Sequence, residues 1–114
     1  MKNFIKFPKG FFWGAASSSY QTEGGNFNDW TLGEKENCER LAKETGKSPE
    51  NFINGLACDH YHRYCEDFDL GKTLGLNACR ISLEWSRIEP EEGKFDEKEL
   101  AHYKEVIAAM KERN

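Results

Sequence analysis

The feature that most constrains the fold is a stretch near the amino terminus that passes from bulky apolar residues through small ones to a polar turn. Its sequence is Phe11-Phe12-Trp13-Gly14-Ala15-Ala16-Ser17-Ser18-Ser19-Tyr20-Gln21-Thr22-Glu23-Gly24-Gly25. Aromatic residues followed by small ones are typical of a short strand buried on both faces. Such a strand in an α/β enzyme carries its binding chemistry at the carboxyl end. The stretch therefore predicts a buried parallel strand over about 11–18, followed by either a binding site or an ordinary polar turn.

Strands and helices alternate along the rest of the chain. Apolar periodicity predicts a helix over about 59–74, a second strand over about 76–83 and a helix over about 96–113. The last helix has an apolar stripe, and Asp96 with Glu99 resembles a capping box at its start. The stripe consists of Leu100, Tyr103, Val106, Ile107 and Met110. This alternation predicts an α/β fold with two βα units of a parallel arrangement.

Residues 26–55 interrupt the alternation as an excursion between the first strand and its helix. We expect a loop over 26–32, an exposed helix over 34–45 that Gly46 closes, and a second helix entry at Ser48-Pro49-Glu50. Excursions of this kind carry the variable surfaces of barrel enzymes.

Composition limits the classes of partner. The chain has 114 residues, enough for one domain, and a net charge of −4 from 16 basic and 20 acidic residues. We expect no nucleic acid or membrane partner, because there is no basic patch and no apolar run of the roughly 20 residues that a membrane helix needs. The amino terminus lacks the apolar core of a signal peptide, which predicts a cytoplasmic protein.

The cysteine and histidine residues do not form a convincing metal or disulfide pattern. Cysteines lie at 38, 58, 65 and 79, with no CxxC spacing, so buried free thiols are favoured over two disulfides or a metal site. His60 and His62 form a His-x-His pair beside Asp59, but residues two apart on a helix point in nearly opposite directions. We therefore predict no metal site and no cofactor.

Three blocks of the sequence resemble family 1 glycoside hydrolases, the β-glucosidase family. The first block is Phe12-Trp13-Gly14-Ala15-Ala16 with Ser19-Tyr20-Gln21-Thr22-Glu23-Gly24. The second is Ala57-Cys58-Asp59-His60-Tyr61-His62-Arg63-Tyr64, and the third is Cys79-Arg80-Ile81-Ser82-Leu83-Glu84-Trp85-Ser86-Arg87-Ile88-Glu89-Pro90. The blocks occur in the family's order and cover nearly the whole chain. The resemblance implies that residues 1–114 are the amino-terminal fragment of a (β/α)8 TIM barrel, its first two βα units, and an incomplete barrel in this chain.

The resemblance also implies roles for individual residues. Gln21 falls on the family's glutamine that binds sugar hydroxyls, although Thr22 stands where an aliphatic residue is usual. Arg80 falls on the arginine that hydrogen-bonds the catalytic nucleophile, whereas without the resemblance a structural ion pair would be the preferred interpretation. Trp30 matches a tryptophan beside the sugar site. Glu23 is expected to tether its loop rather than react.

The remaining aromatic candidates are Trp13 and Trp85, which could stack on a sugar ring but more often pack in the core or a loop.

The resemblance implies retaining hydrolysis of terminal β-linked sugars, which needs two carboxyl groups. The family's Asn-Glu-Pro and Glu-Asn-Gly motifs do not occur in this sequence, and neither Glu36-Asn37-Cys38 nor Glu50-Asn51-Phe52 is given a role. We therefore expect no catalytic residue in this chain and no activity from the chain alone. Three accounts stay open: part of an active β-glycosidase, one piece of a split enzyme, or a non-enzymatic sugar- or protein-binding module. Exposed strand edges would favour self-association or a complementary chain.

Overall fold

A computed structural model describes residues 4–113, so the ends of the 1–114 assignment fall outside the described residues. The elements in chain order are β1 (Gly14–Ala16), α1 (Ser19–Thr22), α2 (Asp29–Thr45), the 3₁₀ helix η1 (Pro49–Phe52), α3 (His60–Thr73), β2 (Ala78–Arg80), α4 (Trp85–Ile88) and α5 (Glu97–Glu112). The larger elements thus follow the order strand, excursion, helix, strand, helix.

The two strands form a parallel pair in which Gly14 lies opposite Ala78, Ala15 opposite Cys79 and Ala16 opposite Arg80. Both strands are shorter than the ranges expected from the sequence, with three residues each. Gly14 is required by the pairing, because a Cβ there would lie 2.7 Å from the Ala78 carbonyl oxygen. The small residues of the first stretch therefore allow close strand pairing.

The expectation that the first strand is buried on both faces is wrong for the described structure. All three residues of β1 are exposed, and so are Cys79 and Arg80 in β2. A pair of three-residue strands cannot bury its own faces, and the neighbouring helices leave these positions open. Burial of the strand would need further layers of structure on the sheet.

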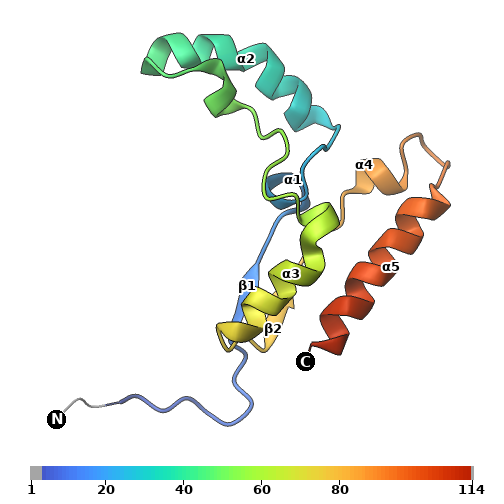
Figure 1. Cartoon of the computed structure of the whole chain (residues 1–114). Helices are drawn as coiled ribbons and strands as arrows, with labels where there is room; N and C mark the ends of the chain where they lie inside the picture. The colour runs from blue at the N-terminus through green and yellow to red at the C-terminus, as the bar shows by residue number, and fades with distance from the viewer. Residues whose placement is uncertain (1–3, 114) are drawn as a thin grey trace.

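The excursion contains more helix than expected. Asp29–Thr45 is a single helix, so residues 29–32 are helical rather than loop. The helix begins there because the Asn28 side chain accepts hydrogen bonds from the backbone N–H groups of Trp30 and Thr31. Gly46 ends it in the left-handed conformation, with φ of 69°, as predicted. Figure 1 shows α2 extending away from the sheet, and η1 packs beside it.

Two short helices were not expected from the sequence. Residues 19–22 form α1 within the predicted polar turn, and residues 85–88 form α4 between the predicted second strand and the predicted last helix. Each helix begins within five residues of the end of a strand. The two strand exits are therefore more ordered than turn composition suggests.

Helix α5 packs beside α3 (Figure 1) and supplies three of the six buried hydrophobic residues within 4–113. Tyr103, Val106 and Ala109 are buried on its inner face, and Ile88 of α4 is buried against it. Asp96 caps the helix by accepting hydrogen bonds from the backbone of Lys98 and Glu99. The reciprocal half of the predicted capping box is replaced by another contact, because the Glu99 carboxylate accepts a hydrogen bond from the Tyr61 hydroxyl.

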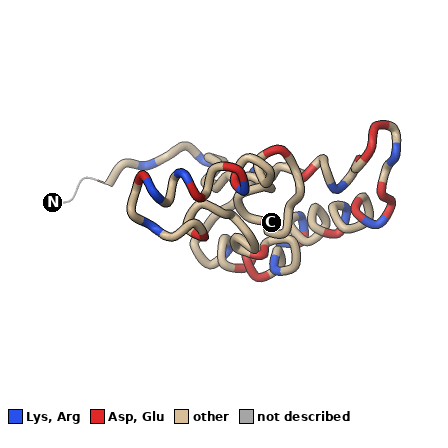
Figure 2. The backbone as a smooth tube through the Cα atoms, turned by 90° about the horizontal axis from the view of Figure 1, so that it is seen from above, with Lys and Arg blue, Asp and Glu red and all other residues tan. Residues whose placement is uncertain are grey.

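Charged residues of both signs are interspersed along the chain (Figure 2). Of the helices within residues 4–113, none has the length and apolar character to span a bilayer.

Candidate functional site

The carboxyl ends of the two strands are fastened side by side. The backbone N–H of Ser17 donates to the Arg80 carbonyl at 3.0 Å, and the N–H of Ser19 donates to the Ser82 hydroxyl at 2.8 Å. These bonds join the segment that enters α1 to the segment that leaves β2. Polar residues from both segments therefore share one end of the sheet.

Gln21 lies in α1, just beyond the end of β1, and it is exposed. Its backbone N–H donates to Ser18, while its side-chain amide makes no hydrogen bond to another residue within 4–113. The amide can both donate and accept, which suits it to adjacent hydroxyl groups.

Arg80 is the last residue of β2, and it is also exposed. Its guanidinium has no salt-bridge partner among the residues that the structure describes. The structural ion pair considered from the sequence is therefore not formed within 4–113. A cation at this position can pair with an anion supplied by another segment.

Glu23, at the carboxyl end of α1, tethers its loop, as predicted. Its carboxylate is buried, and each of its two oxygens lies 3.0 Å from the Tyr103 hydroxyl, which donates to them. One of these oxygens also lies 3.3 Å from Arg87 Nε. Arg87 also donates to the Gly24 carbonyl at 2.6 Å and lies 4.3 Å over the centre of the Tyr61 ring. Burial raises the pKa of Glu23, although the hydrogen bond from Tyr103 and the charge of Arg87 oppose that rise.

Glu84 is a second buried carboxylate, in the segment between β2 and α4. Burial disfavours its charge, but hydrogen bonds from Asn26, Ser86 and Asn28 outweigh burial and hold its pKa below the usual value. The carboxylate oxygens of Glu23 and Glu84 are therefore engaged in hydrogen bonds within the fold rather than free for reaction.

The three tryptophans lie at the surface of the described structure. Trp13 packs with Phe7 and Phe11, with ring centres 4.5 and 4.9 Å away. Trp85 donates to the Glu89 carboxylate at 2.8 Å. Trp30 is the most exposed of them, at 71%, and its ring centre is 6.3 Å from that of Tyr20.

The two candidate histidines bind different carboxylates. His60 Nδ1 is 2.6 Å from Asp67, and His62 Nδ1 is 2.7 Å from Asp59. Asp59 occupies the N-cap position of α3, but its side chain makes no cap hydrogen bond. Groups of three or more potential metal ligands do not occur among residues 4–113.

All four cysteines are free thiols, and the expectation that they are buried holds only for Cys38. The other three are exposed: Cys79 on the open two-stranded sheet, Cys65 on the exposed face of α3, and Cys58 in the turn before α3.

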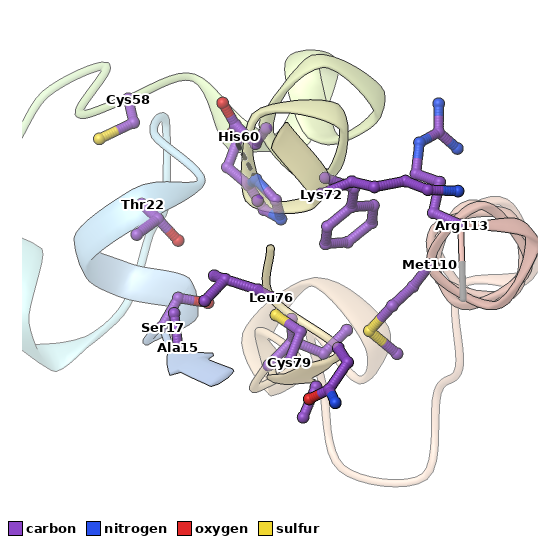
Figure 3. A pocket seen from close by; sticks show the side chains of 16 residues that line it. Ala15, Ser17, Thr22, Cys58, His60, Lys72, Leu76, Cys79, Met110 and Arg113 are labelled. Atoms are coloured by element: carbon purple, nitrogen blue, oxygen red, sulfur yellow. Dashed lines mark hydrogen bonds and ion pairs between the residues drawn. The ribbon is translucent and has the colours of Figure 1, made fainter. Parts of the chain in front are cut away.

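A cavity of about 290 Å³ lies between the sheet and the helices α3 and α5. Figure 3 shows that His60 and Lys72 of α3, Cys79 of β2 and Met110 of α5 line it. Gln21 and Arg80 are not among its lining residues. It is a gap between two layers of the fold, and at one end it reaches Ser17 and Thr22 after β1 and Ile81 after β2.

Sequence reasoning missed the residues that support the strand ends. Tyr103 was recognised only as part of an apolar stripe, and Glu84, Arg87 and Asn28 were given no role. A weak signal was present, since Glu84 is an acidic residue directly after an apolar strand.

Comparisons with known proteins identify the family that the chain resembles. The family model described as Glycosyl hydrolase family 1 matches residues 3–114. Beta-glucosidase A of Acetivibrio thermocellus is 39% identical over 109 residues, covering 95% of this chain and 24% of the relative. Beta-glucosidase 44 of Arabidopsis thaliana is 41% identical over 111 residues, covering 91% of this chain and 20% of the relative.

Solved structures give the same result. A family 1 β-glucosidase from Thermotoga maritima is 34% identical with a TM-score of 0.74, covering 95% of this chain and 24% of that chain. A β-glycosidase from Pyrococcus horikoshii is 41% identical with a TM-score of 0.72, covering 95% of this chain and 23% of that chain.

Proposed function

This chain belongs to glycosyl hydrolase family 1 and spans about a quarter of the length of the relatives it matches, and on that premise we propose that it is the amino-terminal part of a retaining β-glycosidase. The proposed substrate is a terminal β-linked sugar. The proposed fold of the whole protein is a (β/α)8 barrel, to which this chain contributes the first two βα units.

The observation that carries the proposal is that two exposed polar side chains, each without a side-chain hydrogen bond or ion pair within residues 4–113, follow or end the two paired strands. Gln21 follows β1, Arg80 ends β2, and the hydrogen bond between Ser19 and Ser82 holds the two exits together. The Gln21 amide would bind sugar hydroxyls. The Arg80 guanidinium would keep the nucleophilic carboxylate ionised and oriented.

The reacting pair is proposed to come from later strands of the barrel. Retaining hydrolysis uses two carboxyl groups about 5–5.5 Å apart, one as nucleophile and one as acid and base. Glu23 and Glu84 are the buried carboxylates at the strand exits, and their oxygens are occupied by hydrogen bonds to Tyr103, Asn26, Asn28 and Ser86. They therefore support the loops rather than perform the reaction.

Hydrolysis of aryl β-glucosides by the protein encoded by the complete gene tests the proposal. We expect the complete protein to hydrolyse them and the purified 114-residue chain to be inactive. Gln21→Ala in the complete protein should raise KM. Hydrolysis by the chain alone, abolished by Gln21→Ala, would place the reacting pair within these residues and contradict the proposal.

The open sheet favours a second role, as one piece of a split enzyme. Within residues 4–113 each strand is paired along only one edge, so the other edge can accept a complementary chain or a second copy. The mass of the native assembly, measured by light scattering, distinguishes a free monomer from a complex with a complementary chain and from a dimer. The cytoplasmic location stays a prediction that cell fractionation can test.

A further inference from the structure

Glu84 is the centre of a hydrogen-bond cluster that joins the exits of the two strands. Glu84 lies in the segment between β2 and α4, at the N-cap of α4, and is only 7% exposed. Its carboxylate accepts hydrogen bonds from Asn26 at 2.6 Å, from Asn28 at 3.2 Å and from Ser86 at 2.8 Å. Asn26 and Asn28 belong to the segment that follows β1, so the cluster links residues 56 and 58 positions apart.

Both the oxygen and the nitrogen of the Asn28 side-chain amide form hydrogen bonds. Its oxygen accepts from the backbone N–H groups of Trp30 at 3.0 Å and Thr31 at 3.3 Å, and thereby caps α2. Its nitrogen donates to Glu84. A helix N-terminus needs an acceptor and a carboxylate needs a donor, so only one orientation of the amide satisfies both. Glu84 therefore fixes the orientation of the group that starts α2.

The start of α2 carries Trp30 toward the segment of Gln21. The Trp30 ring is tilted by 34° against the ring of Tyr20, with 6.3 Å between their centres, and Tyr20 immediately precedes Gln21. Trp30 has no burial of its own to hold it, since it is 71% exposed. Its position depends on where α2 begins.

We propose that Glu84 is a positioning residue for substrate binding, which acts through Asn28 to hold Trp30 and the Tyr20–Gln21 segment in place. This inference rests on the proposed function, because it assumes that sugar binds beside Gln21. Glu84 itself touches no substrate. Its loss should therefore weaken binding more than it slows the chemical step.

The proposal is tested in the complete protein by exchanging the amide of Asn28 and the carboxylate of Glu84. Asn28→Asp keeps the helix cap but sets a second carboxylate against Glu84, and we expect KM for an aryl β-glucoside to rise about tenfold with kcat within about threefold. Glu84→Gln combined with Asn28→Asp restores a donor facing an acceptor. The double variant should return KM to within about threefold of the unaltered protein.

Two further variants serve as controls. Asn28→Ser keeps a cap oxygen but is too short to reach Glu84, so KM should rise even if Asn28→Asp fails to fold. Glu44→Gln removes a carboxylate of the same type from the exposed pair with Arg40, and KM should not change.

The outcomes separate this inference from the proposed function. If the unaltered protein hydrolyses glycosides and neither Asn28 variant raises KM, the inference is overturned and the function stands. If the double variant binds as poorly as Asn28→Asp alone, the inference is likewise overturned. If the unaltered protein hydrolyses no glycoside, the proposed function fails and the inference fails with it.

Discussion

The hydroxyl of Tyr103 on α5 donates to the carboxylate of Glu23 after β1, at 3.0 Å from each oxygen, across 80 residues of sequence. The same hydroxyl accepts the backbone N–H of Glu84 at 3.1 Å. One side chain therefore connects the last helix to the exits of both strands. The geometry of the candidate site depends on this connection.

Tyr103→Phe should destabilise the chain by about 1–3 kcal/mol, because it leaves the Glu23 carboxylate and the Glu84 N–H buried without their partner. Urea unfolding followed by tryptophan fluorescence measures the change. Tyr64→Phe is the matched control, since the Tyr64 hydroxyl makes no hydrogen bond within residues 4–113, and it should cost less than about 0.5 kcal/mol. Equal losses in the two variants would contradict a special role for Tyr103.

Gly24→Ala should cost about 3 kcal/mol or more, since a Cβ at Gly24 would lie 2.0 Å from the Leu56 carbonyl oxygen and its φ is +82°. Gly25 has a φ of +62° but nothing within 4 Å of an added Cβ, so Gly25→Ala should cost only about 1–2 kcal/mol. The same urea experiment separates the clash from the backbone strain that both share. A smaller loss at Gly24 than at Gly25 would show that the turn shifts freely.

Stability should depend on the protonation of Glu23. Burial raises its pKa in the folded state above the ordinary value of 4.5, so the unfolded chain releases this proton first as the pH rises. The contribution of Glu23 to the free energy of unfolding therefore falls as the pH rises from about 4.5 to the pKa of Glu23 in the folded state. Glu23→Gln should remove that fall. The test is the urea concentration at the midpoint of unfolding, measured for the unaltered chain and for Glu23→Gln between about pH 3 and about pH 7.

Glu84 should show the opposite sign. Its folded pKa lies below 4.5, so its contribution is present above that value and is lost as the pH falls through the folded pKa. Glu84→Gln should flatten the acid side of the profile. Parallel profiles for the unaltered chain and for both variants would refute the assignment of either carboxylate.

Local patterns in the sequence predicted the elements that depend on neighbouring residues. The apolar stripe of α5, with Tyr103 and Val106 buried, follows from helical periodicity alone, and Gly46 ended α2 as its composition predicted. The start of α2 was missed because Asn28 caps the helix inside a segment that has loop composition. A cap is one residue, and periodicity does not detect it.

The support of the candidate site could not be predicted, because its contacts are distant in sequence. Glu23 pairs with a residue 80 positions away, and Asn28 with one 56 positions away. Nothing in the local pattern around Glu84 indicates that amide groups from another βα segment will satisfy its carboxylate. The buried state of β1 was overestimated for a related reason, since burial of a strand depends on layers beyond its own residues.

The last prediction concerns Arg80 in the complete protein. Arg80 is exposed at the end of β2 and holds no ion pair within residues 4–113, so Arg80→Met should leave the thermal unfolding midpoint of the 114-residue chain nearly unchanged. If its partner is the nucleophile, turnover should fall about 100-fold. The pKa of the nucleophile should rise when the cation is removed, because the neighbouring positive charge favours the ionised form.

The pH–rate profile decides between this role and a structural one. The nucleophile must be ionised, so activity is lost as the pH falls through its pKa, and a raised pKa moves the acidic limb to higher pH. Arg63→Met removes an exposed arginine that pairs with Glu66 and should leave both turnover and the acidic limb in place. If Arg80→Met also leaves both unchanged, Arg80 does not support the nucleophile and serves only the local structure of the strand.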